Sequence, residues 1–172
     1  MTISAPIFTM SLAIAASSYA AEAGLPSTHG ENLNGQQIEF PGVLQGKVSV
    51  CVFGFSKTAG DPAKAWMTRL EKEGIEAWSV ADLEGAPSLV RGMIKSSMRK
   101  GTSESLRGRS LVLTKDEKAW KQALGATQPD LPVVAVFDSN GQTAWTYEGL
   151  VGADVLKRVK AKLESLKSLQ TR

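Results

Sequence analysis

The sequence has little sulfur and almost no histidine: its 172 residues include one cysteine, Cys51, and one histidine, His29. A single thiol excludes an internal disulfide, a CxxC redox pair and a zinc site built from several cysteines. A single histidine excludes a histidine-rich metal centre and argues against a Ser-His-Asp triad. We therefore expect neither a resident metal nor a cofactor.

The N-terminus lacks a basic residue, but it otherwise resembles a secretory signal. An uncharged, mostly apolar run covers Pro6–Ala16, too short for the roughly 20 residues of a membrane span. Small residues follow, and Ser18–Ala20 and Ala21–Ala23 both suit signal cleavage. We predict a signal peptide over residues 1–23 and export to the periplasm or beyond, with the segment either cleaved or kept as a tether.

The rest of the chain has the composition of one globular domain. Hydrophobic residues make up 42% of the sequence and the formal net charge is +3, which is normal for a folded chain of this length. Residues 24–34 are polar and turn-rich, which predicts an exposed leader. We place a single domain over residues 35–169.

Hydrophobic periodicity predicts alternating strands and helices in that domain. Lys47–Phe55 (KVSVCVFGF) is the strongest strand, and its continuous apolar run is typical of a central strand buried on both faces. The further strands expected are Gln37–Val43, Ile75–Val80, Ser110–Thr114, Val133–Phe137 and Gln142–Tyr147; the helices expected are 61–74, 87–100, 116–124 and 153–166. This order predicts an α/β sandwich with a mixed sheet, a C-terminal β-hairpin and a final helix.

Three segments in this order resemble the thioredoxin superfamily, most closely its exported TlpA-like and AhpC/TSA-like branch. Asn32–Lys47 is similar to the branch's entry segment, Val52–Trp66 to its strand, active-site loop and first helix, and Leu131–Gly141 to its proline strand and turn. The resemblance covers nearly the whole chain after the signal. It implies a three-layer thioredoxin-like sandwich.

The second segment decides what chemistry the resemblance allows. With proline aligned on proline, the family's C-G-P-C-K falls on Gly60–Lys64 without a gap. Gly60 then takes the place of the nucleophilic cysteine and Ala63 that of the resolving cysteine. Thiol–disulfide exchange needs a thiolate. In the peroxiredoxin T-x-x-C alignment, the positions near Thr58 and Asp61 also lack sulfur, so the residues predict a redox-inactive domain.

Cys51 does not replace the missing pair. It lies within the central strand, where a cysteine usually acts as a small buried hydrophobic residue. We predict an unreactive thiol.

The loop and the proline segment form the candidate binding face. The resemblance implies that Ser56, Thr58, Gly60 and Asp61 lie beside Leu131 and Pro132, that the Leu131–Pro132 bond is cis, and that the face binds an extended polypeptide. Asp61 has a simpler interpretation as the N-cap of the following helix. Pro132 is equally consistent with a structural remnant that binds nothing.

A second candidate surface is basic. Arg91, Lys95 and Arg99 follow one another at helical spacing and share one helix face. They suit an acidic partner or anionic headgroups, although a solvated helix face is the commoner explanation for such a pattern. Aromatic residues are not interleaved with them, which argues against a nucleic-acid target.

These observations predict an exported protein with a thioredoxin-like fold that has lost its redox chemistry and acts in protein binding or assembly. The alternative is a divergent thiol oxidoreductase or antioxidant protein of the TlpA or AhpC/TSA type, and the residues argue against it.

Overall fold

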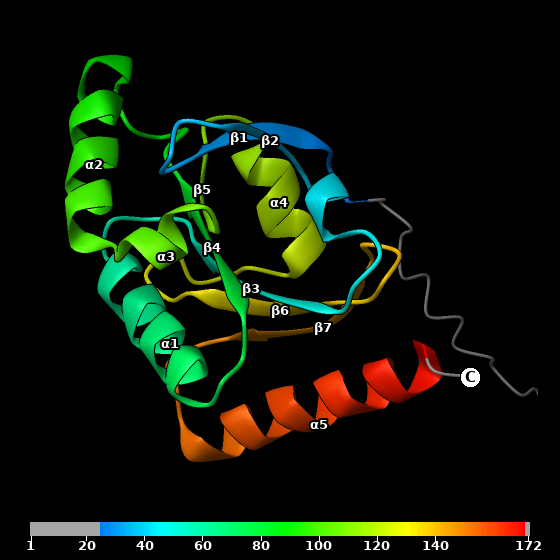
Figure 1. The fold of residues 1–172 in the computed structure, drawn as a ribbon. Coiled ribbons are helices and arrows are strands. Elements are labelled where there is room, and N and C mark those ends of the chain that lie inside the picture. The colour runs from blue at the N-terminus through cyan, green and yellow to red at the C-terminus, as the bar shows by residue number, and fades with distance from the viewer. Residues whose placement is uncertain (1–24, 171–172) are drawn as a thin grey trace, which may run out of the picture.

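The computed structural model describes residues 25–170, and the predicted signal segment lies outside them. A mixed sheet of seven strands forms the middle layer, with helices on both faces (Figure 1). The strands are β1 Thr28–Asn32, β2 Gln37–Phe40, β3 Ser49–Gly54, β4 Ala77–Asp82, β5 Ser110–Leu113, β6 Val133–Phe137 and β7 Thr143–Glu148. The helices are η1 Gly42–Leu44 (3-10), α1 Gly60–Lys72, α2 Ser88–Gly101, α3 Glu104–Arg107, α4 Glu117–Leu124 and α5 Ala153–Gln170.

The strands lie in the order β2-β1-β5-β4-β3-β6-β7. β3, β4 and β5 are parallel to one another, and the remaining pairs are antiparallel. Parallel neighbours need crossover connections, which α1, α2 and α3 provide. The predicted α/β sandwich with a mixed sheet and a terminal hairpin and helix is confirmed.

β3 shows why the middle of the sheet is apolar throughout. Successive side chains point to opposite faces: Val50 and Val52 belong to one core cluster, and Cys51 and Phe53 to the other. The first cluster packs against α1 and α5, and the second packs against α4 and η1. The strand that was predicted to be buried on both faces is therefore central.

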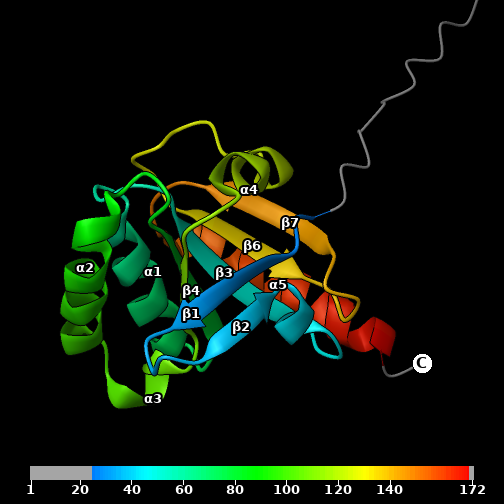
Figure 2. The same cartoon turned by 90° about the horizontal axis from the view of Figure 1, so that it is seen from above.

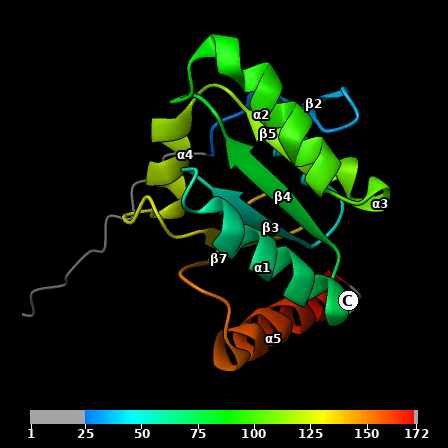
Figure 3. The same cartoon turned by 90° about the vertical axis from the view of Figure 1, so that its left-hand side faces the viewer.

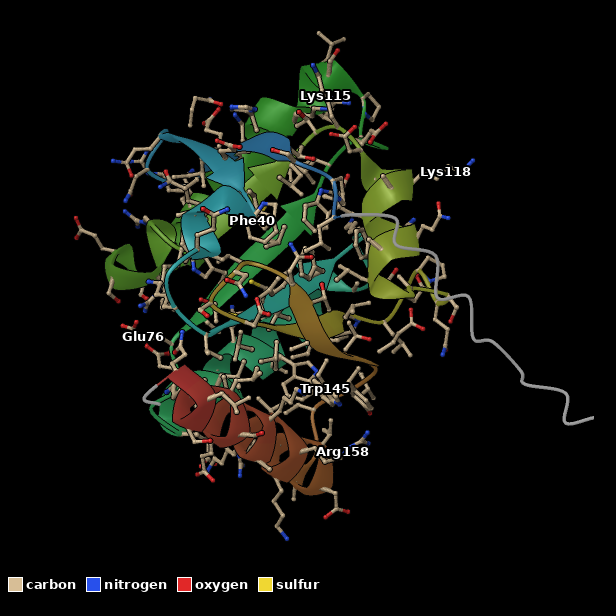
Figure 4. All side chains as sticks on the ribbon, turned by 90° about the vertical axis from the view of Figure 1, so that its right-hand side faces the viewer. Phe40, Glu76, Lys115, Lys118, Trp145 and Arg158 are labelled. Carbon is tan, nitrogen blue, oxygen red and sulfur yellow. The ribbon has the colours of Figure 1, made fainter. Side chains whose placement is uncertain are left out.

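The two faces use different side chains. Below the sheet in Figure 1, Trp66 of α1 is fully buried and its indole N–H donates to the carbonyl oxygen of Gly149 at 2.8 Å. On the same face, the half-buried Trp145 of β7 contacts the guanidinium of Arg158 from α5, which lies 5.6 Å from the ring centre (Figure 4). Above the sheet, Phe40 and Phe53 meet Trp120 of α4 at centroid separations of 5.1 and 5.7 Å.

The prediction that residues 24–34 form an exposed leader is wrong. Thr28–Asn32 forms β1, which pairs with β2 on one side and with β5 on the other. Gly30 allows β1 to lie close to β5, because a Cβ at this position would be only 2.7 to 2.8 Å from side-chain atoms of Leu111 and Leu113. The folded domain therefore begins before residue 35.

Other boundaries differ in smaller ways. The segment between the expected helix 87–100 and the expected strand Ser110–Thr114 contains the short helix α3, and α5 runs four residues beyond Leu166 to Gln170. α2 is the outermost helix and has no buried residue (Figure 2). Within residues 25–170, no helix is both long and apolar enough to cross a membrane.

Candidate functional site

The loop after β3 places the first turn of α1 at the carboxyl end of the parallel strands. The side chain of Ser56 holds this turn: its Oγ accepts the backbone N–H of Ala59 at 3.1 Å. The N–H of Gly60 donates to the carbonyl oxygen of Lys57 at 3.1 Å, and the helix begins at Gly60. The prediction that Asp61 caps the helix is wrong, because Asp61 already lies inside the first turn, where its carboxylate suits the helix dipole.

The two positions that hold cysteines in the family pattern lie where a redox pair would need to be. Gly60 is exposed at the helix N-terminus, and a Cβ added to it would meet no atom within 4 Å. Ala63 follows one turn later and is 8% exposed. A thiol at Gly60 would have the accessibility and the helix-terminal field that lower a cysteine pKa. Neither residue supplies a thiolate, either for disulfide exchange or as a ligand for a soft metal.

Cys51 cannot take over this role. It is fully buried in β3, between Trp78 of β4 and Ala135 of β6. Burial raises the pKa of its thiol well above the ordinary value. A neutral thiol without access to solvent does not act as a nucleophile, in agreement with the predicted packing role.

The proline segment lies beside the loop, as expected, but its backbone differs from the prediction. Phe53 of β3 pairs with Val133 of β6, and the Oγ of Ser56 lies 3.5 Å from a carboxylate oxygen of Asp130. The cis bond in the described chain is Phe40–Pro41, so the expectation of a cis bond at Leu131–Pro132 is wrong. The free-energy difference between the isomers of an X–Pro bond is small, and sequence pattern alone does not decide it.

Several backbone groups of this segment are already used within the domain. The carbonyl oxygen of Pro132 accepts the N–H of Gly149 at 3.0 Å, and the N–H of Leu131 donates to Gln128 at 3.2 Å. Pro132 itself is buried. The exposed part of the candidate face therefore comes from the Ser56–Asp61 loop, with the half-buried Leu131 at its edge.

One carboxylate fixes the chain that leads to this edge. Glu148 accepts hydrogen bonds from the backbone and hydroxyl of Thr127 at 2.8 and 2.6 Å and from the backbone of Gln128 at 2.8 Å. Partial burial by itself would raise the pKa of Glu148, but these hydrogen bonds outweigh it and lower the pKa. The loop before Leu131 is thus held by β7.

A group of carboxylates that sequence analysis missed lies at the same end of the sheet. Asp82 ends β4, Glu84 follows in the next loop and Glu117 begins α4; one oxygen of each lies within 4.8 Å of the others. Asp82 is 8% exposed. Burial raises its pKa to about 6, and the charges of Glu117 and Glu84 add to this effect. The signal for this group in the sequence is an acidic residue at the carboxyl end of a parallel strand.

Lys121 connects this group to the loop. Its ammonium pairs with Glu117 and also lies over the ring of Phe55, 5.6 Å from the centroid. Phe55 directly precedes the loop residue Ser56. Figure 3 shows β4 ending beside α4, so two neighbouring loops carry the two candidate regions.

The predicted basic face is largely engaged within the domain. Arg91 donates to the carbonyl oxygens of Ala86 and Glu84 at 2.9 and 2.8 Å, and Lys95 pairs with Glu31 at 2.8 Å. Arg99 is exposed on the same helix. Contact between this face and an acidic surface stays a prediction.

Comparison with known proteins agrees with this architecture. No protein-family model matches the chain, and no curated protein compared with it matches either. Among solved structures, BsSco, a member of the Sco family of cytochrome c oxidase assembly proteins, superimposes with a TM-score of 0.56 at 12% identity, covering 81% of this chain and 92% of BsSco.

Two further structures give similar values. The exposed lipoprotein thioredoxin Etrx1 of Streptococcus pneumoniae has a TM-score of 0.54 at 16% identity, covering 79% of this chain and 99% of Etrx1. A SCO1/SenC family lipoprotein of Bacillus anthracis has a TM-score of 0.53 at 17% identity, covering 83% and 94%. Similarity at this identity establishes the fold alone. This chain therefore has a thioredoxin-like fold, in which glycine and alanine stand at the two positions of the redox pair.

Proposed function

We propose that this chain is an exported protein that uses a thioredoxin-like domain for protein binding or assembly, without redox chemistry. The observation that carries the proposal is the pair Gly60 and Ala63 at the start of α1. The chain has the fold and the exposed helix N-terminus, but it lacks the two thiols that an oxidoreductase would need there. The one thiol of the chain, on Cys51, is buried in the central strand.

The contact surface we propose is the exposed end of the domain around the Ser56–Asp61 loop. Thr58, Gly60 and Asp61 are exposed there, and Leu131 adds a half-buried apolar edge. The loop is held by the Ser56 hydrogen bond and by the core residue Phe55 beneath it, so it presents a defined shape. A partner that binds here meets the carboxylate of Asp61, the ammonium of Lys57 and small polar groups.

Support for export and assembly comes from two sources. The apolar run Pro6–Ala16 followed by small residues suits a signal peptide. Two of the structures similar in fold are named as lipoproteins, and BsSco is named as a member of a family of oxidase assembly proteins. A role in assembly outside the cytoplasm is consistent with both.

A disulfide-exchange assay tests the redox part of the proposal. The purified chain is expected to reduce insulin disulfides no faster than the dithiothreitol background, and Cys51→Ser is expected to give the same rate. Turnover above background that survives Cys51→Ser would overturn the proposal in favour of a divergent oxidoreductase.

Photo-crosslinking tests the binding part. A photoreactive amino acid at Thr58 is expected to crosslink to a specific partner in the producing cell, and the same group at Glu164, exposed on α5, is not. The added substitution Asp61→Lys should abolish the Thr58 crosslink. Equal crosslinking from both positions, or insensitivity to Asp61→Lys, would show that this loop is not the contact surface.

A further inference from the structure

The acidic group formed by Asp82, Glu84 and Glu117 plays no part in the proposed binding role. Its three side chains come from the end of β4, the following loop and the first turn of α4. β4 and β5 are parallel, and both connections leave from their carboxyl ends, where ligand sites of α/β sheets are usually found. Chain segments from two crossovers thus bring three carboxylates to one point.

One oxygen of each carboxylate is fixed by the chain itself. Asp82 accepts the backbone N–H of Glu84 at 2.7 Å, and Glu84 accepts the backbone N–H of Glu117 at 2.7 Å. The third carboxylate, on Glu117, pairs with Lys121. Arg91 also clamps the loop, by donating to the carbonyl oxygen of Glu84. The group is therefore arranged before any ligand arrives.

The second oxygen of Asp82 has no partner. Oδ2 is buried and makes no hydrogen bond to any described residue. Asp82 as a whole is more than nine-tenths buried, so bulk water does not replace the missing partner. Leaving a charged oxygen unpaired in such a place is costly. Because the carboxylates of Glu84 and Glu117 lie within 4.8 Å, their repulsion adds to this cost. A cation at this point removes both penalties.

The charges and ligand types define the cation. Three carboxylates opposed by Lys121 leave two negative charges, which a divalent ion neutralises. Carboxylate oxygens are hard ligands that suit Ca²⁺, Mg²⁺ and Mn²⁺. Ca²⁺ accepts irregular coordination at about 2.3–2.6 Å, so oxygens on opposite sides of it are separated by up to about 5 Å, whereas Mg²⁺ demands near-ideal octahedral geometry at about 2.0–2.1 Å.

We propose that Asp82, Glu84 and Glu117 form a calcium-binding site at the carboxyl edge of the parallel strands. Water completes the coordination on the side of the exposed Glu84. Sites with few charged ligands on a partly open surface bind Ca²⁺ with dissociation constants on the order of 10⁻⁴–10⁻³ M, a range typical of extracellular modules. The site does not depend on the proposed protein-binding role.

Calorimetric titration of the chelator-treated, dialysed chain with CaCl₂ at about pH 7.5 tests this site. We expect one saturable site per chain and a matching rise in melting temperature. The absence of saturable binding up to about 10 mM, well above the expected dissociation constant, would overturn the proposal. Tighter binding of MgCl₂ than of CaCl₂ would overturn the assignment to calcium.

Asp82→Asn is the sharpest variant, because an asparagine keeps the size of the side chain and the oxygen that accepts the Glu84 N–H. It should bind Ca²⁺ at least tenfold more weakly, while its far-ultraviolet spectrum and its melting without calcium show that it folds. Glu164→Gln, which removes an exposed carboxylate on α5, is the matched control and should bind as the unaltered chain does. Unchanged affinity in Asp82→Asn would contradict the site.

Discussion

The two loops at the carboxyl edge of the sheet differ in backbone geometry and in the side chains they carry. The loop after β3 has the geometry of a redox site, with an open helix N-terminus at Gly60, but no thiol. The region after β4 has three carboxylates, and one of them has a buried oxygen without a partner. The fold thus keeps the helix N-terminus in place whether or not a thiol stands on it. The unpaired oxygen of Asp82 points to a ligand more directly than the vacant cysteine positions at Gly60 and Ala63 do.

Restoring sulfur to the first loop should have the largest effect. Gly60→Cys combined with Ala63→Cys places two thiols one turn apart at a helix N-terminus, where a thiolate is stabilised. We expect the pair to form a disulfide and insulin reduction to appear above the dithiothreitol background. The control is Gly60→Ser with Ala63→Ser. If the cysteine pair remains reduced under oxidising conditions, or turns over no faster than the serine control, α1 does not hold the geometry we describe.

Phe55→Ala should disturb both regions at once. The ring is 7% exposed, stacks on Phe53 at 6.0 Å and carries the ammonium of Lys121. Losing a buried phenylalanine costs about 3 kcal/mol in the free energy of unfolding, which urea denaturation measures. Leu89→Ala on α2 is the control, because Leu89 is 96% exposed and should change stability little. Equal effects of the two substitutions would refute the packing role of Phe55.

Asp82→Asn should stabilise the chain when calcium is removed. The pKa of Asp82 is raised from 3.8 to about 6 in the folded state, so the folded chain loses stability as the pH rises through this interval and the carboxyl ionises. Allowing for partial solvent screening, the variant should gain about 1–2 kcal/mol at about pH 7.5 and almost nothing near pH 4. Denaturation with chelator at both pH values measures this. A gain that is independent of pH would contradict the stated cause.

The smallest effects separate the Ser56 hydrogen bond in the turn before α1 from the Asp61 charge in its first turn. Ser56→Ala removes the hydrogen bond to the Ala59 N–H and should cost about 1 kcal/mol. Asp61→Asn keeps a side chain of the same size and removes only a favourable charge in the first turn, worth about 0.5 kcal/mol at low salt. Thermal denaturation of both variants gives the order, and the reverse order would show that the Asp61 charge stabilises the start of α1 more than the Ser56 hydrogen bond does.

Sequence patterns predicted the elements whose side chains report directly on burial. KVSVCVFGF became the doubly buried β3, and the vacant cysteine positions fell at the start of α1 as the proline alignment required. β1 was missed, because its sequence THGEN has the polar and glycine content of a turn. Gly30 is required there by contact with β5, and a distant partner strand leaves no trace in local sequence.

The site was harder to predict than the fold for a related reason. Asp82 and Glu84 look like ordinary loop residues in sequence, and their meaning depends on Glu117, which arrives from another crossover. The isomer at Pro132 and the residue at which α1 begins involve free-energy differences of about 1 kcal/mol. Differences of that size are settled by tertiary contacts rather than by residue type.

The bond between Trp66 and Gly149 ties together residues 83 positions apart. It joins the helix that begins at the vacant cysteine position to the turn that leads from β7 into α5. Movement of the turn after β7 away from α1 would leave the buried indole N–H without an acceptor, so α1 and α5 should open as one cooperative unit. Hydrogen exchange at the Trp66 indole then reports, with a single proton, how often α1 and the C-terminal helix open together.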